Sequence, residues 1–294
     1  MFEEKINTFL EKQSNKEKLI VIYGPTASGK TAMSIDLAKK LNTEIISTDS
    51  RQIFKEMNIW TAKILEEEMD WVVHHMIDII YPNGEYSVWE FKTESEKIIN
   101  DLIWKWKIPI LCWWTGLYID SLIYDFQIPE VIADWDLRKR LEDEAKKFWN
   151  DFIYEKLKIL DPENYHKIHK NNVQYVIRAI EVITKTWKSK YEQGVNKIPK
   201  YDILFLTPYN WDREKLYDRI NLRVEMMFEQ WLLEEVQNLL KKYKKTDFWL
   251  KSIWYDEIIK YFDWEYSLAE AKDKIKQNSR NYAKRQLTWF RKYK

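Results

Sequence analysis

The eight residues from Gly24 to Thr31 carry the clearest chemistry in this chain. They read Gly-Pro-Thr-Ala-Ser-Gly-Lys-Thr and match the pattern G-x-x-x-x-G-K-[ST] in full. In such loops the glycines let the backbone curl, so that its N–H groups face an anion. Lys30 adds a positive charge and the Thr31 hydroxyl can bind Mg²⁺. We predict a phosphate-binding loop, with a chance glycine turn as the alternative. The predicted contacts are Gly24, Pro25, Thr26, Ala27, Ser28, Gly29, Lys30 and Thr31.

The elements around this loop follow an α/β pattern. Apolar runs predict strands at 19–23, 44–48, 108–112 and 201–206. Helical spacing predicts helices at 30–41, 87–104, 212–242, 252–261 and 268–291. Strands that alternate with helices are typical of a parallel sheet covered by helices on both faces. The loop therefore lies between a strand and a helix, as its mechanism requires.

The middle of the chain differs from this pattern. From about residue 134 to residue 190 the strand signals vanish and helical spacing dominates. We predict a P-loop NTPase-like α/β core formed by residues 1–125 and 202–294, interrupted by an all-helical insertion at residues 126–201.

Two carboxylates follow apolar runs and could serve the phosphate site. Kinases and NTPases that use ATP hold their metal with a carboxylate at the end of a separate strand. Asp49 and Asp78 are the candidates. Asp49 ends the strand that follows the loop helix, at the sheet edge where α/β proteins bind ligands. Neither carboxylate decides the question on its own.

Several blocks of sequence follow one another in a specific order. They read Ile45-Ile-Ser-Thr-Asp-Ser-Arg-Gln52, Thr61-Ala-Lys63, His74-His-Met-Ile-Asp78, Tyr86-Ser-Val88, Thr115-Gly-Leu-Tyr118, Val176-Ile-Arg-Ala-Ile-Glu-Val182, Tyr217-Asp-Arg-Ile-Asn221 and Tyr282-Ala-Lys-Arg-Gln-Leu-Thr-Trp-Phe-Arg291. Between residues 19 and 291 the chain closely resembles the tRNA dimethylallyltransferase family. The resemblance implies transfer of a dimethylallyl group from dimethylallyl diphosphate to N6 of adenosine 37 in tRNA, with release of diphosphate.

The resemblance also implies roles for the loop and its surroundings. Lys30, Thr31, the loop amides and the cofactor Mg²⁺ would stabilise the departing diphosphate, with help from Arg219 and Arg223. These two arginines are four residues apart on a predicted helix, where like charges are unfavourable unless an anion lies between them. Two solvated arginines on a surface helix are the alternative.

The reacting adenosine has its own implied residues. Asp49 would be the general base for the N6 proton, with a helix cap or a Mg²⁺ ligand as the alternative. The implied catalytic residues are Asp49, Thr31 and Thr115. The implied tRNA contacts are Asp49, Ser50, Arg51, Gln52, Thr115, Arg138, Gln174, Tyr175, Val176, Ile177 and Arg178. Because N6 is inaccessible while the base is stacked, the base must be extruded into a deep channel.

Two further groups of residues carry weaker signals. His74 and His75 are adjacent, so they point in different directions, and a structural role is favoured over a metal site. The basic C-terminal segment, interleaved with aromatic residues, is a candidate strip for the phosphates of the anticodon stem. It comprises Arg280, Lys284, Arg285, Arg291, Lys292 and Lys294.

Composition limits the class of protein. The chain has 294 residues with 48 Lys and Arg against 47 Asp and Glu, so tRNA must meet a local basic patch instead of an overall positive field. One cysteine excludes a disulfide framework and fits a reducing compartment. We see no signal peptide and no membrane-length apolar run. We expect a cytoplasmic, monomeric enzyme of the bacterial type, whose partners are the tRNA anticodon stem-loop and dimethylallyl diphosphate.

Glycine and tryptophan depart from normal usage. The chain has 5 Gly and 16 Trp, whereas glycine normally makes up about 7% of residues. The family usually has glycine where this chain has Trp60, Trp106, Trp113, Trp114, Trp187, Trp231, Trp254 and Trp264, and Trp71 and Trp149 extend the set. We hypothesise that the gene uses UGA for glycine and is translated here with UGA as tryptophan. A genuine tryptophan-rich paralogue with a blocked site is the alternative.

Overall fold

The chain divides into two compact units. The computed structural model describes residues 2–113, 115–126, 128, 131, 133–191, 195–210, 212–245, 250 and 254–293. One unit comprises Met1–Ile123 with Pro199–Lys294, and the other comprises Tyr124–Ile198. These limits lie close to the predicted ones.

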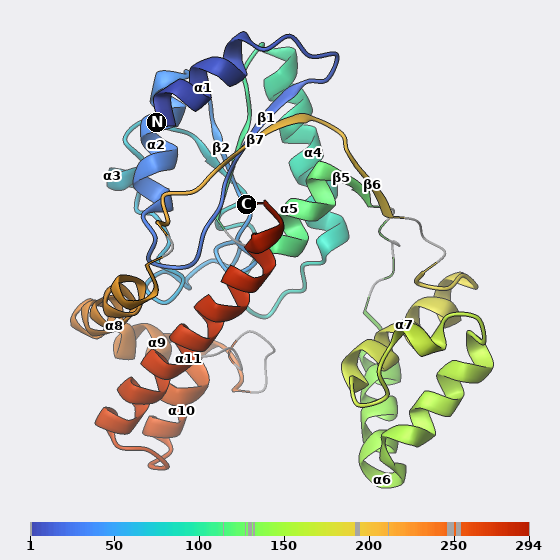
Figure 1. Cartoon of the computed structure of the whole chain (residues 1–294). Coiled ribbons are helices and arrows are strands. Elements are labelled where there is room, and N and C mark those ends of the chain that lie inside the picture. Colours follow the sequence, from blue (N-terminus) through green and yellow to red (C-terminus); the bar gives the residue numbers. More distant parts are fainter. Residues whose placement is uncertain are drawn as a thin grey trace. The chain divides into compact units, whose positions relative to one another are not determined.

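The first unit is built on a five-stranded parallel sheet (Figure 1). The strands are β1 (Lys18–Ile22), β2 (Ile45–Ser47), β3 (His74–His75), β4 (Ile110–Cys112) and β7 (Asp202–Leu206), and their order is β3-β2-β4-β1-β7. In the register, Ile20 of β1 faces Ile110 on one side and Leu204 on the other. Because all strands are parallel, the loops that follow β1, β2 and β4 meet at one edge.

Helices cover both faces of this sheet, which confirms the predicted fold class (Figure 1). The helices of the unit are α1 (Phe2–Glu11), α2 (Lys30–Lys40), α3 (Glu66–Met69), α4 (Val88–Trp104), α5 (Gly116–Ile123), α8 (Arg213–Glu229), α9 (Leu232–Lys242), α10 (Tyr255–Phe262) and α11 (Leu268–Phe290), followed by a short 3₁₀ turn at Arg291–Tyr293. On one face Phe9 of α1 and Leu37 of α2 pack on Ile20, Ile22 and Ile45. α4 begins with the predicted capping box: the Glu90 N–H donates to Ser87 Oγ.

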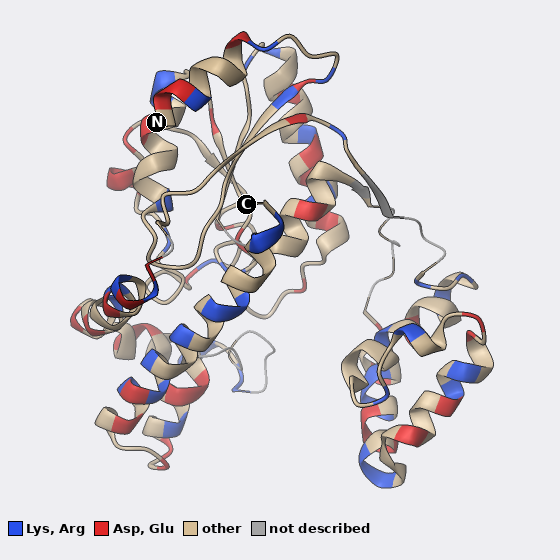
Figure 2. Ribbon diagram, in the orientation of Figure 1, with Lys and Arg blue, Asp and Glu red and all other residues tan. Residues whose placement is uncertain are grey.

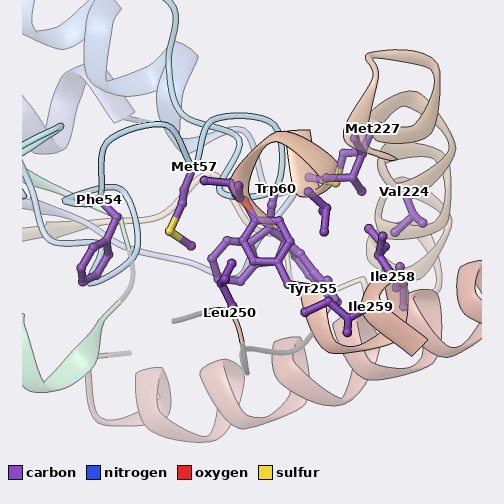
Figure 3. Close-up of a cluster of buried hydrophobic side chains, with 14 of the residues drawn as sticks. Phe54, Met57, Trp60, Val224, Met227, Leu250, Tyr255, Ile258 and Ile259 are labelled. Carbon is purple, nitrogen blue, oxygen red and sulfur yellow. The ribbon is translucent and has the colours of Figure 1, made fainter. Parts of the chain in front are cut away.

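A second hydrophobic core joins the segment 53–60 to α8, α9 and α10 (Figure 3). The Trp60 indole lies against Tyr255, with ring centroids 5.1 Å apart. The single helix predicted over 212–242 is wrong, because α8 ends at Glu229 and α9 begins at Leu232. Trp231 separates them with a left-handed φ of 72°, which cannot continue a right-handed helix.

The second unit is mainly but not wholly helical. Its helices are α6 (Trp135–Leu160), a 3₁₀ turn at Tyr165–Lys167 and α7 (Val173–Thr186). Leu141 and Ile153 of α6 pack on Val176 and Ile180 of α7. The expectation of an all-helical insertion is wrong in one respect, since β5 (Tyr124–Phe126) and β6 (Val195–Pro199) form a two-stranded sheet. Polar residues interrupt both strands, Tyr-Asp-Phe and Val-Asn-Lys-Ile-Pro, so neither has the continuous apolar run that marks a buried strand in the sequence.

None of the helices in the described part of the chain has the length and apolarity needed to cross a lipid bilayer.

Candidate active site

The loops after β1, β2 and β4 enclose a cavity of about 170 Å³ together with residues of α2, α8 and α11 and with Trp254, which directly precedes α10. This is the sheet edge at which the parallel topology predicts a ligand site. The residues that line the cavity are Thr26, Ala27, Ser28, Gly29, Lys30, Thr31, Asp49, Arg51, Trp60, Thr61, Ala62, Trp113, Arg223, Trp254 and Tyr282.

The loop between β1 and α2 needs glycine at both ends. Gly29 stands directly before α2 with a φ of 92°, a conformation that side-chain-bearing residues rarely adopt. A Cβ on Gly24 would lie 2.9 Å from Ser28 Oγ, so a side chain there would collide with the loop itself. The loop thus leads into the N-terminus of α2, where free N–H groups and the helix dipole favour an anion.

Lys30 places a buried cation at this helix N-terminus. The residue is 6% exposed, and its Nζ donates a hydrogen bond to Pro25 O at 2.7 Å. Burial is the main reason that the pKa of Lys30 is lowered to about 8; Arg223 also lowers this pKa, whereas Cys112 and Asp49 act in the opposite direction. An anion in the cavity would therefore meet a cation that has lost most of its water, where electrostatic attraction is strong.

Arg223 brings a second positive charge from α8. Its Nη1 donates to Thr26 Oγ1 at 2.9 Å, and burial lowers the pKa of Arg223 to about 10. From α11, Gln286 Oε1 accepts a hydrogen bond from the Thr26 N–H at 3.0 Å. Arg219 is exposed and does not line the cavity. Its contact with diphosphate stays a prediction.

Asp49 faces these cations. The carboxylate is 5% exposed, and its Oδ1 accepts a hydrogen bond from the Arg51 N–H at 2.8 Å. Its negative charge raises the pKa values of Lys30 and Arg223 against the opposing effect of burial. A carboxylate at this position can accept a proton from a ligand held against the loop.

Asp78 has a different task. Its Oδ1 accepts a hydrogen bond from Lys63 Nζ at 2.5 Å, and Lys63 also donates to Phe54 O and Asn58 Oδ1. Asp78 does not line the cavity. Of the two carboxylates that the sequence left open, only Asp49 lies at the phosphate loop. Asp78 instead stabilises the 54–63 segment through the buried Lys63.

Thr115 ties two strand ends together. Its Oγ1 accepts a hydrogen bond from the Ser50 N–H at 3.0 Å, and its own N–H donates to Thr48 O at 3.0 Å. The residue does not line the cavity, so its catalytic role stays a prediction. Next to it, a Cβ on Gly116 would lie 2.1 Å from the Trp289 indole, so only glycine fits there.

The next residues of the β2 loop differ in their exposure to the cavity. Arg51 lines it, and burial lowers the pKa of its guanidinium. Gln52 is fully buried; its Oε1 accepts from Ser47 Oγ at 3.2 Å, and its Nε2 donates to Thr61 O at 3.4 Å. The contacts predicted between tRNA and these residues stay predictions.

Sequence reasoning missed part of the cavity wall. Thr61 and Ala62 line it from the segment after Trp60, and Tyr282 lines it from α11. Burial raises the pKa of Tyr282 well above its ordinary value, so its hydroxyl stays protonated and can donate. One signal in the sequence could have identified them: Thr61 and Ala62 lie in the family-like block 61–63, and Tyr282 lies in the family-like block 282–291.

Two hydroxyl groups of the phosphate loop are available to a hard cation, together with oxygens from a ligand. Ser28 Oγ is buried without a hydrogen-bond partner, and the Thr31 hydroxyl lines the same cavity. Among the residues that the structure describes, no three His, Cys, Asp or Glu side chains form a metal-binding group. Hydroxyl oxygens in the cavity and oxygens of a bound ligand suit Mg²⁺, because this ion usually keeps several coordinated water molecules and needs few protein ligands.

The two adjacent histidines have the structural contacts that the sequence predicts. His75 Nε2 contacts Glu44 Oε2 at 2.7 Å, and His74 Nδ1 contacts Val72 O at 2.9 Å.

In the second unit, a buried carboxylate organises two arginines. Glu181 of α7 is fully buried and accepts hydrogen bonds from Arg138 Nε at 2.9 Å and Nη2 at 2.8 Å, from Arg178 and from the Asp134 N–H. Burial by itself would raise the pKa of Glu181, but these hydrogen bonds outweigh it and leave the pKa below its usual value. Glu181 thus fixes the positions of two predicted tRNA contacts.

The other predicted tRNA contacts on α7 separate into two kinds. Gln174 and Tyr175 are exposed, so their side chains can meet a ligand. Val176 and Ile177 are buried in the core of the unit. The predicted contact cannot come from these two side chains, because α7 turns them toward α6. We correct their role to packing.

We predict that Glu181→Gln destabilises the second unit by about 3 kcal/mol, because it removes the anion between two arginines that remain partly solvated. The effect depends on pH. The pKa of Glu181 is lower in the folded protein than in the unfolded chain. Its charge therefore stabilises the fold fully at pH values above the unfolded-state pKa, and this stabilisation is lost as the pH falls through the folded-state pKa. Urea unfolding at pH 7 and pH 4, followed by circular dichroism, measures this. An equal pH response in the variant and the parent would contradict the assignment.

Comparison with known proteins places the whole chain. It matches the family described as IPP transferase over residues 52–293 and the family described as isopentenyl transferase over residues 17–77. It is 50% identical over 281 residues to the tRNA dimethylallyltransferase of Alkaliphilus oremlandii, covering 95% of this chain and 90% of the relative. The chain belongs to the tRNA dimethylallyltransferase family.

Further relatives of the family agree. The Acetivibrio thermocellus tRNA dimethylallyltransferase is 48% identical over 279 residues, covering 94% of this chain and 89% of the relative. The crystal structure of the Bacillus halodurans tRNA isopentenylpyrophosphate transferase matches with a TM-score of 0.67 and 41% identity, covering 94% and 87% of the two chains. A eukaryotic dimethylallyltransferase crystallised acting on tRNA matches with a TM-score of 0.77 and 30% identity, covering 93% and 70%. Membership makes the chain a prenyltransferase.

Proposed function

We propose that this chain transfers the dimethylallyl group of dimethylallyl diphosphate to N6 of adenosine 37 in tRNA. One observation carries the proposal: Lys30, Arg223 and Asp49 line a single cavity at the N-terminus of α2. Two cations there suit a diphosphate, and the carboxylate suits an N–H nucleophile. In the reaction the N6–C bond forms and the allylic C–O bond breaks, and diphosphate leaves with the electron pair of that bond.

The phosphate loop supports the departing group. Negative charge on the bridging oxygen grows as the C–O bond breaks, so positive charge that is already in place stabilises the transition state more than the substrate. Lys30 and Arg223 are held by Pro25 O and Thr26 Oγ1, so little reorganisation is needed. Arg219, one turn earlier on α8, is proposed to contact the outer phosphate from the exposed side.

Mg²⁺ would be held by the Thr31 hydroxyl together with diphosphate oxygens, and when bound it would neutralise part of the negative charge of the leaving diphosphate. The partnerless Ser28 Oγ beside it offers a further oxygen.

Asp49 is proposed to take the proton that N6 loses. The carboxylate is buried beside Arg51, and the Arg51 N–H fixes one of its oxygens. We assign this carboxylate to the N6 proton. Thr115 fixes the neighbouring Ser50 N–H, so we give Thr115 a positioning role for the Asp49 loop.

Both units offer groups for tRNA. α11 carries Lys and Arg along its length (Figure 2). In the second unit Arg138 and Arg178 are held by Glu181, beside the exposed Gln174 and Tyr175. Basic side chains of this kind bind the phosphates of an RNA stem, and exposed aromatic rings stack on unpaired bases. We propose that the anticodon stem-loop contacts both units.

Two further proposals concern the cellular compartment and the oligomeric state of the enzyme. We propose that it works in the cytoplasm, where tRNA is found and where the buried Cys112 stays a thiol. We also propose that it acts as a monomer.

The test is the identity of the phosphate donor. Here the glycine form means the chain with glycine in place of Trp60, Trp71, Trp106, Trp113, Trp114, Trp149, Trp187, Trp231, Trp254 and Trp264. The glycine form is incubated with unmodified tRNA and either radiolabelled dimethylallyl diphosphate or γ-labelled ATP, with Mg²⁺. We expect label from the first donor in N6-modified adenosine and no consumption of ATP.

Other outcomes separate the alternatives. Consumption of ATP without prenylation would make the chain a kinase or NTPase. Binding of tRNA without turnover of either donor would make it an RNA-binding module. Either result contradicts the proposal. A tRNA transcript with guanosine at position 37 is the matched control, because it lacks the N6 amine and should accept no label.

A further inference from the structure

Eight tryptophans hold a backbone conformation that suits glycine. Among the described residues, fifteen that are not glycine have positive φ, and eight of these are tryptophans. Their φ values lie between 58° and 97°. The eight are Trp71, Trp106, Trp113, Trp149, Trp187, Trp231, Trp254 and Trp264. The chain also has 18 Tyr and 12 Phe, and none of those that are described has positive φ. Bulky side chains avoid this region, so aromatic character does not explain the set.

Trp106 shows the pattern in its hydrogen bonds. Beyond the end of α4, the Trp106 N–H donates to Ile103 O at 2.9 Å and the Lys107 N–H donates to Leu102 O at 2.9 Å. These two bonds define the Schellman motif, whose left-handed residue is usually glycine. The Trp106 side chain is 96% exposed, so no packing compensates for the strain.

The same motif recurs beyond α10. There the Trp264 N–H donates to Tyr261 O at 3.2 Å and the Glu265 N–H to Lys260 O at 2.9 Å, and Trp264 is almost fully exposed. At the end of α2, the equivalent left-handed residue is Asn42, with a φ of 47°. Asparagine tolerates this conformation better than other residues with side chains, whereas tryptophan has no such tolerance.

Trp149 is still less suited to its backbone. Inside α6 it has a φ of 69° and a ψ of 163°. This region of the Ramachandran plot is used almost only by glycine. The chain kinks there between two helical segments, which a glycine permits without strain.

Two of the eight, Trp113 and Trp254, line the active-site cavity, together with Trp60. The indole N–H groups of Trp60 and Trp254 are buried without a hydrogen-bond partner, although buried tryptophans usually have one. The ring centroids of Trp60 and Trp254 lie 5.4 Å apart. The cavity of about 170 Å³ is smaller than the roughly 300 Å³ at the lower end of ligand sites. The indoles thus occupy the space that a substrate would need.

We infer that the active enzyme carries glycine at these eight positions, and that the donor pocket is the space released when Trp113 and Trp254 lack their side chains. One cause would explain both observations: the organism reads UGA as glycine. Glycine would remove the backbone strain at all eight positions and would open the pocket. The backbone part of this inference, glycine at the eight positions, is independent of the proposed reaction. The pocket part, the site for the prenyl donor, rests on the proposed reaction. Trp60 has no positive φ and is not one of the eight; it enters the glycine form through the family resemblance and its place in the cavity wall. Trp114 lies outside the described residues.

Two neighbouring tryptophans supply a matched test of the backbone part. Trp104 and Trp106 are 79% and 96% exposed, but Trp104 is the last residue of α4 and has no positive φ. We expect Trp106→Gly to raise the melting temperature by about 2–4 °C, because it removes left-handed strain. We expect Trp104→Gly to lower it, because glycine weakens a helix. A fall in both variants would overturn the inference.

The codons and the ligands complete the test. UGA at positions 106, 113, 187 and 254 with UGG at 289 supports the inference, and UGG at all of them overturns it. For the pocket, calorimetry compares dimethylallyl diphosphate with inorganic diphosphate. The Trp113→Gly/Trp254→Gly double variant should bind dimethylallyl diphosphate at least about tenfold more tightly than the parent protein, which has tryptophan at both positions, with little change for inorganic diphosphate. Equal prenyl affinity would refute the pocket part, whereas failure of prenyl transfer alone would bear on the proposed reaction.

Discussion

Replacing Lys30 by alanine in the glycine form should lower kcat by about 10²- to 10³-fold. Lys30 is the buried cation at the N-terminus of α2, and burial keeps water from screening it. The lost stabilisation concerns charge that develops on the departing diphosphate, so it appears in the chemical step. Single-turnover kinetics with saturating labelled donor measures this rate directly, and the melting temperature shows whether the variant is folded.

Lys39→Ala is the matched control for this variant. Lys39 lies on the same helix, is exposed and pairs with Asp70 on the surface. Its removal should change the rate less than about threefold, because screened surface charges contribute little. A rate for Lys30→Ala within that same range would remove Lys30 from the diphosphate site.

Asp49→Asn should lower kcat by about 10²- to 10⁴-fold while tRNA binding stays within a few-fold. The amide keeps the shape of the side chain, and its oxygen can still accept the hydrogen bond from the Arg51 N–H. It cannot accept a proton from N6. Filter binding with labelled tRNA and single-turnover prenyl transfer separate these two properties.

Asp78→Asn provides the contrast. Asp78 pairs with the buried Lys63 away from the cavity, so we expect a less stable protein with a rate close to that of the parent. Unchanged prenyl transfer in Asp49→Asn would eliminate Asp49 as the base. A reduced rate in Asp78→Asn with an unchanged melting temperature would show that the assignment of the two carboxylates is reversed.

Local sequence patterns predicted much of the fold because they report local energetics. Short continuous apolar runs rich in β-branched residues are typical of strands that are buried on both faces, and β1, β4 and β7 formed where such runs lie. The capping box at Ser87 likewise fixed the start of α4. The break between α8 and α9 was missed because it depends on Trp231, which has no turn propensity as tryptophan. Read as glycine, the same position marks the end of a helix.

The candidate site was predictable in its parts and not in its assembly. The G-x-x-x-x-G-K-T pattern located the phosphate loop, since glycine conformations and a lysine at fixed spacing leave few alternatives. The choice between Asp49 and Asp78 required the tertiary structure, because both follow apolar runs. Only the fold shows that Asp78 meets Lys63 and that Asp49 meets the loop.

Residue types and their spacing were enough to predict the fold class, the phosphate loop, the family resemblance and the surplus of tryptophan over glycine. Tertiary structure decided which side chains share the cavity, that Val176 and Ile177 are core residues, and that Glu181 holds two arginines. It also decided which tryptophans lie on a left-handed backbone. Burial and proximity arise only when distant segments pack together, and a tryptophan at a left-handed turn gives no local sign of that turn, so the sequence reveals none of the three.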